Sequence, residues 1–135
     1  MSPNANRVRR SNLVIGLTGP FGSGCSEMRK VLEDKFAFKA FKISDDIREE
    51  VQNEGKQVEK GIPGWRKVLQ DHGNEKRKNE GAYWINKIIS KIDQSQIGGK
   101  EIVIDGFRNF HEVQEIRKIY PRFFLVAICA EKNNR

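Results

Sequence analysis

The feature of this sequence that most constrains its fold is a glycine-rich stretch, LTGPFGSGCSE, that lies between an apolar run and a helix-like run. The apolar run, residues 12–18, is rich in branched side chains and is typical of a strand covered on both faces. Residues 25–36 follow, with apolar side chains spaced for one helical face at Met28, Val31, Leu32 and Phe36. A glycine turn that leads from a strand into a helix is the setting of phosphate-binding loops. We therefore expect an α/β fold organised around this turn.

The rest of the chain continues the alternation of strands and helices. Hydrophobic patterns predict further strands at residues 37–43, 101–106 and 122–130, and helices from Ser44 or Asp45 onward and at 65–79, 82–94 and 109–120. Residues 53–64 are polar and contain glycines, which predicts a loop. Strands that alternate with helices, each strand buried on both sides, predict a three-layer αβα P-loop fold with a parallel sheet. We expect a flexible arm at residues 1–11 and one domain at residues 12–135.

Charge and hydropathy narrow the range of partners. The formal net charge of +7 suits an anionic partner such as a nucleotide, RNA or DNA, although most basic residues alternate with acidic ones as on a solvated surface. No apolar run approaches the roughly 20 residues of a membrane helix, and no secretory signal is recognised. The cysteines Cys25 and Cys129 form no metal-like spacing with His72 or His111. We therefore predict a cytoplasmic protein without a membrane partner.

The glycine loop fits the pattern G-x-x-x-x-G-x-S, and its predicted phosphate-binding residues are Gly19, Gly22, Ser23, Gly24, Cys25 and Ser26. Gly22 lets the backbone turn so that successive N–H groups point at a phosphate, and the helix N-terminus adds a partial positive charge. Ser26 is placed to offer its hydroxyl to the Mg²⁺ that accompanies ATP or another nucleotide. A glycine-rich turn that binds no ligand is the alternative interpretation.

Cys25 departs from the loop pattern, which places a lysine at this position. The loss of one aimed positive charge typically costs on the order of 10²–10³ in turnover. The backbone cradle depends on glycines and not on this side chain. We therefore predict that nucleotide binding persists better than catalysis.

Further candidates lie where ligands bind parallel sheets, beyond the carboxyl ends of the strands. Asp105 ends an apolar strand, where a carboxylate would orient Mg²⁺ or its waters, and Arg108 can reach the same cleft with a fork suited to phosphate. Both are predicted to be catalytic. Asp45 and Arg48, one helical turn apart, form a second charged pair. Plainer interpretations remain open, namely an Asp-Gly turn for Asp105 and a helix N-cap for Asp45.

Four stretches in this order carry a resemblance to a known family: IGLTGPFGSG, ISDDIREE, LQDHGNEKR and VIDGFRN. They are similar to the P-loop kinase-like domain related to nucleoside monophosphate kinases and dephospho-CoA kinase. More narrowly, they resemble the N-terminal domain fused to deoxycytidylate deaminases in bacterial anti-phage dCTP deaminases. That narrower family also has G-C-[ST] where kinases have G-K-[ST]. The likeness runs from about Leu13 to the last residue.

The resemblance implies roles for individual residues. Asp45 and Arg48 match the D-x-x-R that kinases use on the side of the acceptor nucleotide. Arg77 matches the arginine of a Q-D-x-G-N-x-x-R motif and is expected to bind substrate with them. Asp105 and Arg108 match the family's D-G-x-R. The sequence stops where the arginine-bearing lid of such kinases would begin, so we expect a fragment of a longer protein, with an attached deaminase domain.

Three functions remain open on this basis. A domain that senses a nucleotide, or an inhibitory RNA, and regulates an attached deaminase in phage defence ranks slightly first, because Cys25 replaces the lysine and the lid is missing. An active ATP- and Mg²⁺-dependent nucleotide or nucleoside kinase is the second. Nucleic-acid binding alone ranks last, because the aromatic residues fall in apolar patterns typical of a core and are not interleaved with basic ones.

Overall fold

The computed structural model describes residues 10–19, 24–56 and 61–128 of the chain. Most of the predicted N-terminal arm lies outside these residues, and so do Gly22, Ser23 and Cys129. Part of the predicted loop at 53–64 also lies outside them.

Strands and helices alternate along the described residues as predicted. The elements are β1 (Val14–Thr18), α1 (Cys25–Phe36), β2 (Lys39–Lys42), α2 (Ile43–Asn53), α3 (Trp65–Asn79), α4 (Tyr83–Ser95), β3 (Ile102–Asp105), α5 (Phe110–Ile119) and β4 (Phe123–Ala127). Helix α2 begins one residue before the predicted Ser44, because Lys42 has the extended backbone of the N-cap position. Asp45 and Asp46 then lie in its first turn, where acidic side chains stabilise a helix.

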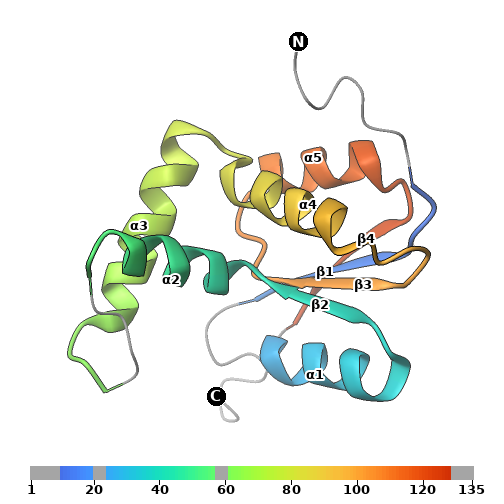
Figure 1. Ribbon diagram of the computed structural model, residues 1–135, viewed down its shortest axis with the longest axis horizontal. Helices are drawn as coiled ribbons and strands as arrows, with labels where there is room; N and C mark the ends of the chain where they lie inside the picture. The colour runs from blue at the N-terminus through green and yellow to red at the C-terminus, as the bar shows by residue number, and fades with distance from the viewer. Residues whose placement is uncertain (1–9, 20–23, 57–60, 129–135) are drawn as a thin grey trace.

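The four described strands form one parallel sheet in the order β2-β3-β1-β4. Helices α4 and α5 cover one face of this sheet and α1 lies on the other, while α2 and α3 extend beyond one edge (Figure 1). The predicted three-layer αβα architecture is therefore confirmed. In the pairing register, Leu17 of β1 and Lys42 of β2 both lie beside Asp105 of β3, so the carboxyl ends of these strands meet at one edge.

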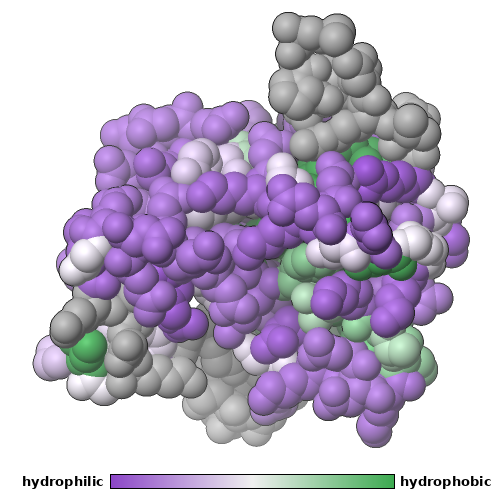
Figure 2. Space-filling model, in the orientation of Figure 1, coloured by the Kyte–Doolittle hydropathy of each residue, from purple (hydrophilic) through white to green (hydrophobic). Residues whose placement is uncertain are grey.

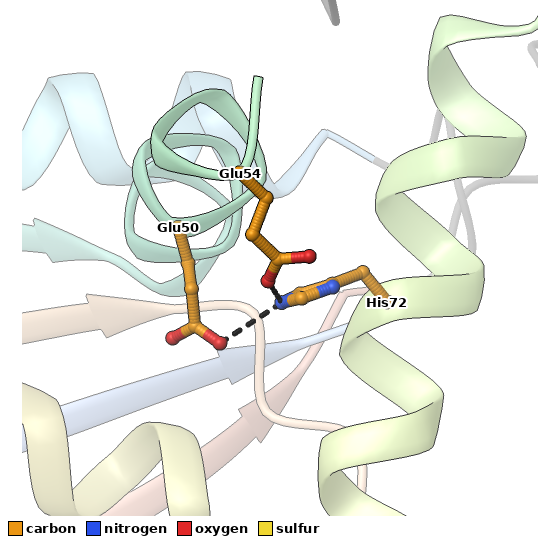
Figure 3. Close-up of side chains that lie close together, drawn as sticks. All are labelled: Glu50, Glu54 and His72. Atoms are coloured by element: carbon orange, nitrogen blue, oxygen red, sulfur yellow. Dashed lines mark hydrogen bonds and ion pairs between the residues drawn. The ribbon is translucent and has the colours of Figure 1, made fainter. Parts of the chain in front are cut away.

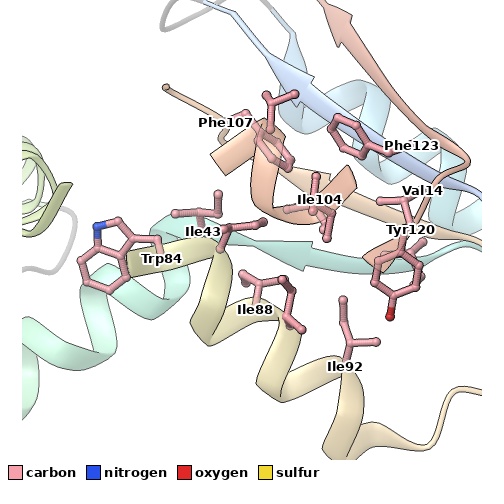
Figure 4. Close-up of a cluster of buried hydrophobic side chains, with 14 of the residues drawn as sticks. Val14, Ile43, Trp84, Ile88, Ile92, Ile104, Phe107, Tyr120 and Phe123 are labelled. Atoms are coloured by element: carbon pink, nitrogen blue, oxygen red, sulfur yellow. The ribbon is translucent and has the colours of Figure 1, made fainter. Parts of the chain in front are cut away.

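The larger hydrophobic core lies between the sheet and helices α4 and α5 (Figure 4). Helix α4 contributes an isoleucine-rich face headed by the fully buried Trp84, whose Nε1 donates to the carbonyl of Gly73 at 3.2 Å. The strands contribute alternate residues, among them Val14 and Ile104. Gly16 lies on this face as well, and it leaves room for the rings of two phenylalanines, Phe107 and Phe123.

The face that α1 covers has a much thinner core. Leu17, Phe38 and Val103 are buried there, and Cys25 and Leu32 of α1 pack against them. The apolar face that the spacing predicts on α1 is mostly not buried, because Met28, Val31 and Phe36 are exposed, the last at 60%. Apolar surface accordingly emerges beside α1 (green in Figure 2) on an otherwise hydrophilic face.

The expectation that every strand is buried on both sides is also wrong for the strands at the edges of the sheet. The central strand β3 is buried throughout, whereas β2 is partly exposed and β4 is largely exposed after its first residue. Phe124, for example, is 58% exposed. Among the described strands, β2 and β4 each have a neighbour on one side only, which leaves more of their surface exposed. Among the described helices, none is long and apolar enough to cross a membrane.

Candidate functional site

Asp105 occupies the centre of the carboxyl edge of the sheet. It ends β3 and is only 7% exposed, because β3 has a strand on either side. Successive side chains of a strand point to opposite faces, so Asp105 shares a face with Val103, which packs on the α1 side. The carboxylate therefore faces helix α1 and not the larger core.

Three cationic side chains from three different segments surround this carboxylate. Arg29 of α1 places its Nε 3.4 Å from Asp105 Oδ2. Burial raises the pKa of Asp105, while the positive charges of Arg29, Lys42 and Arg108 act in the opposite direction. One carboxylate among three cations leaves this edge of the sheet with a local excess of positive charge. Such an excess attracts anions.

Arg108 lies against the start of the glycine loop. Its Nη1 donates to the carbonyl of Gly19 at 3.0 Å. Its backbone N–H donates at 2.8 Å to Oε1 of the fully buried Glu112, which also forms a capping box with Asn109 at the start of α5. Glu112, in the first turn of α5, thus holds the backbone of Arg108, whose side chain reaches the loop. Arg108 therefore lies close to Gly19, as predicted.

The described end of the loop has the geometry of a helix entry. Gly24 is the N-cap of α1 and has a left-handed φ of 102°, a conformation that favours glycine. Cys25 is half-buried, and its side chain packs against the apolar cluster of Leu17 and Val103. Ser26 is exposed in the first turn of the helix. Gly22 and Ser23 lie outside the described residues, so the phosphate cradle of the whole loop stays a prediction.

Asp45 and Arg48 form the pair that their spacing predicted, with Arg48 Nη1 3.7 Å from Asp45 Oδ1. The guanidinium of Arg48 also lies over the ring of Trp65, 5.9 Å from its centroid. Asp45 helps to line a shallow cleft of about 350 Å³ together with Lys42 and Lys91. That Asp45 and Arg48 bind a substrate stays a prediction.

Arg77 is held within the framework that supports the site. Its Nε donates to Glu112 Oε2 at 2.9 Å, and its Nη2 lies 3.5 Å from the carbonyl oxygen of Gly106, just after β3. Arg77 therefore links α3 to α5 and to the turn that follows Asp105. These contacts give it a positioning function in the structure, and the predicted contact with substrate stays untested.

The sequence analysis missed Arg29 and Lys42. The periodicities of the elements that carry them indicate the face or the edge on which each lies, but not that either approaches Asp105. Lys42 is the last residue of β2, and parallel strands bring their carboxyl ends to one edge. Arg29 lies four positions after Cys25, on the same face of α1, and Asp105 shares the face of Val103 that this helix covers. What the sequence lacked was the order of the strands.

A second cluster of charged groups lies at the junction of α2, α3 and α4. Glu50 of α2 and Glu54, the C-cap residue of this helix, point toward His72 of α3, whose Nε2 lies 2.9 Å from Glu50 Oε1 and 3.7 Å from Glu54 Oε2 (Figure 3). On its other oxygen, Glu50 accepts hydrogen bonds from Tyr83 at 2.7 Å and from Lys87 at 2.5 Å. Burial alone would raise the pKa of Glu50, but these hydrogen bonds outweigh it and lower the pKa to about 2.

The side chains of Glu50, Glu54 and His72 approach one another as metal ligands do, with their ligand atoms within 4.8 Å. A divalent cation at this point would meet the ammonium groups of Lys87 and of Lys76, which lies 3.6 Å from Glu50 Oε1. Two positive charges already neutralise the carboxylate. The cluster is therefore better explained as a network that holds α2 against α3 and α4.

Comparison with known proteins shows what this chain is similar to. No protein-family model matches the chain. The chain is 33% identical over 107 residues to a UPF0200 protein of Sulfurisphaera tokodaii, a match that covers 78% of this chain and 53% of that protein. A UPF0200 protein of Methanothermobacter thermautotrophicus is 27% identical over 124 residues, covering 91% and 58% respectively. A third, from Pyrococcus abyssi, is 30% identical over 110 residues, covering 81% and 55%. The chain thus spans about half the length of the curated relatives it matches.

Among solved structures, the chain resembles that of a protein from Chloroflexus aurantiacus described as a candidate kinase. The TM-score is 0.53 and the identity 14%, and the match covers 87% of this chain and 58% of the other. The fold is kinase-like. This likeness supports the predicted αβα fold with its parallel sheet. None of these descriptions mentions a deaminase or phage defence, so the narrower resemblance stays a prediction.

Proposed function

We propose that this chain binds the phosphate groups of a nucleotide at the carboxyl edge of the sheet, between the β1–α1 loop and Asp105. The observation that carries the proposal is the gathering of Arg29, Lys42 and Arg108 around one buried carboxylate. The N-terminus of α1 adds backbone N–H groups and the positive end of its dipole at the same edge. A phosphate chain is the ligand whose charge and geometry this arrangement complements.

Ser26 and Asp105 are the residues that would hold Mg²⁺. Mg²⁺ is usually bound through one or two carboxylates together with substrate phosphates, and a hydroxyl with one carboxylate fits such a site. The three cations near Asp105 disfavour a divalent ion at this carboxylate alone. We therefore expect Mg²⁺ to bind together with ATP or another nucleotide and not before it, supplying charge neutralisation to the phosphates.

Nucleotide sensing is the function that follows best from the side chain of Cys25. This side chain packs against apolar residues, so the position from which a loop lysine would neutralise phosphate holds no charge. Binding without fast phosphoryl transfer suits a regulatory domain. The predicted partner is a deaminase domain in the same longer protein, with inhibitory RNA as a further predicted ligand.

An active nucleotide kinase is the second candidate. Asp105 and Arg108 lie together at the end of β3, and Arg108 contacts the start of the loop, as a phosphotransferase would require. The description of the structural neighbour as a candidate kinase favours the same function. The two candidates share one binding site and differ only in turnover.

The binding site can be tested with a pair of glycine variants. Gly24→Ala forces alanine into a left-handed backbone at the entry of α1, whereas Gly55→Ala imposes similar strain, at φ 85°, on a glycine with no atom near its Cβ position. Isothermal titration with ADP, ATP and dCTP in Mg²⁺ should show binding by the wild type and Gly55→Ala, and about tenfold or weaker affinity for Gly24→Ala. A wild type that binds none of the nucleotides, or two variants with equal affinity, would refute the site.

Turnover separates the two candidates. Labelled ATP is incubated with the protein and a panel of nucleotide acceptors, with Ser26→Ala and Asp105→Asn as controls. The sensing function predicts transfer on the order of 10²–10³ slower than a loop with its lysine would give. Fast transfer that both substitutions abolish would establish the kinase instead. Adding nucleotide to the full-length gene product and measuring deamination of dCMP or dCTP tests the predicted partner domain.

A further inference from the structure

The structure brings Arg29 close to Cys25, the position at which the loop lacks its lysine. Arg29 follows Cys25 by four positions on α1, so the two residues lie on one face of the helix, about 6 Å apart along its axis. Side chains of a helix lean toward its N-terminus, and that is the direction of the loop. In the structure the Arg29 side chain reaches the carboxyl edge of the sheet and lies beside Asp105.

The contact with Asp105 leaves part of the Arg29 side chain unsatisfied. The Nε–Oδ2 distance of 3.4 Å is long for a hydrogen bond, and Nε is buried with no well-formed hydrogen bond among the residues that the structure describes. The side chain is 16% exposed. A buried donor without an acceptor is unfavourable, so the guanidinium is poised to accept a ligand that brings oxygen atoms to it.

We propose that Arg29 supplies to the phosphates of a bound nucleotide the positive charge that Cys25 cannot supply. This inference rests on the proposed function. The planar fork of arginine presents two parallel donors and binds phosphate oxygens in pairs, so one guanidinium can contact phosphate while Asp105 keeps it oriented. The ligand class that follows is a nucleoside di- or triphosphate, because the loop lysine that Arg29 would replace contacts the β and γ phosphates, which a monophosphate lacks.

The direct test compares Arg29→Gln with Lys30→Gln. Lys30 is the next residue of the same helix and is exposed, so its substitution makes the same change in net charge away from the edge of the sheet. Isothermal titration with ADP and AMP should show ADP affinity reduced about 10- to 100-fold in Arg29→Gln. AMP affinity should fall much less, and Lys30→Gln should bind both like the wild type. Circular dichroism reports folding, and Arg29→Lys, which keeps the charge, should fall between wild type and Arg29→Gln.

A structural role for Arg29, limited to neutralising Asp105, makes the opposite prediction in double variants. If Arg29 acts on the phosphates, adding Cys25→Lys to Arg29→Gln should restore ADP binding, because an ammonium returns to the loop. If Arg29 only balances the carboxylate, adding Asp105→Asn should restore the binding of ADP measured without Mg²⁺, and Cys25→Lys should not. That outcome, or wild-type ADP affinity in Arg29→Gln, would overturn the inference alone. A wild type that binds neither ADP nor ATP would overturn the proposed function itself.

Discussion

Replacing Glu112 by alanine should destabilise the chain and release Arg108, which contacts Gly19 at the start of the glycine loop. Glu112 is fully buried. Its Oε1 accepts the backbone N–H groups of Arg108 at 2.8 Å and Asn109 at 3.2 Å, and its Oε2 accepts Arg77 Nε at 2.9 Å. One carboxylate thus caps α5, positions Arg108 and neutralises a guanidinium from α3.

The magnitude follows from these contacts. Removing one partner of a buried ion pair typically costs about 3–5 kcal/mol, because the other charge stays buried without a partner. The orphaned N–H groups at the start of α5 add a cost of about 1 kcal/mol. Since the two effects share one side chain they are not additive, and we expect a loss of about 4 kcal/mol in the free energy of unfolding for Glu112→Ala. This is a large part of the roughly 5–15 kcal/mol typical of a domain.

Urea unfolding at pH 7, followed by circular dichroism, measures this loss. Glu112→Gln keeps an acceptor for the N–H of Arg108 but turns an amide toward Arg77, so we expect a smaller loss of about 2 kcal/mol. Gln114→Ala, at an exposed position of the same helix, should stay within about 0.5 kcal/mol of the wild type. A double variant with Glu112→Leu and Arg77→Met should recover part of the stability, because no charge stays unpaired. The reasoning is refuted if Glu112→Ala unfolds within about 1 kcal/mol of the wild type.

Two further predictions concern the core and the Glu50 network. Gly16→Ala would place a Cβ atom 2.6 Å from Phe123 and 2.8 Å from Phe107, so we expect a loss of about 1–3 kcal/mol in the free energy of unfolding. Gly99→Ala, whose Cβ atom would have no atom within 4 Å, should leave the thermal unfolding unchanged. The pKa of Glu50 falls from its usual 4.5 to about 2 on folding. The charge of Glu50 therefore stabilises the fold by about 3 kcal/mol above pH 4.5, and this contribution is lost as the pH falls toward 2. The stability difference between wild type and Glu50→Gln, measured by urea unfolding, should therefore narrow from pH 7 to pH 3; a difference independent of pH would contradict the assignment.

Much of the fold could be predicted because its signals are local. The apolar strand before the glycine-rich stretch and the helix after it appear where the sequence predicted them, and most element boundaries agree within two residues. Asp105 could be assigned to the edge of the sheet from the end of its strand alone, since carboxyl ends of parallel strands meet. The prediction failed where burial depended on a neighbour. Phe36 and Phe124 carry apolar side chains that are exposed, because hydrophobicity does not tell which face of an element another element covers.

The amino-acid sequence by itself determined the alternation of strands and helices and the absence of a lysine from the glycine-rich stretch, because periodicity is set by neighbouring residues. Only the tertiary structure decided that Arg29 of α1 and Lys42 of β2 approach Asp105, and that His72 joins Glu50. Each of these contacts joins residues far apart in the chain. Their distances depend on strand order and on how the helices pack, which no local pattern encodes.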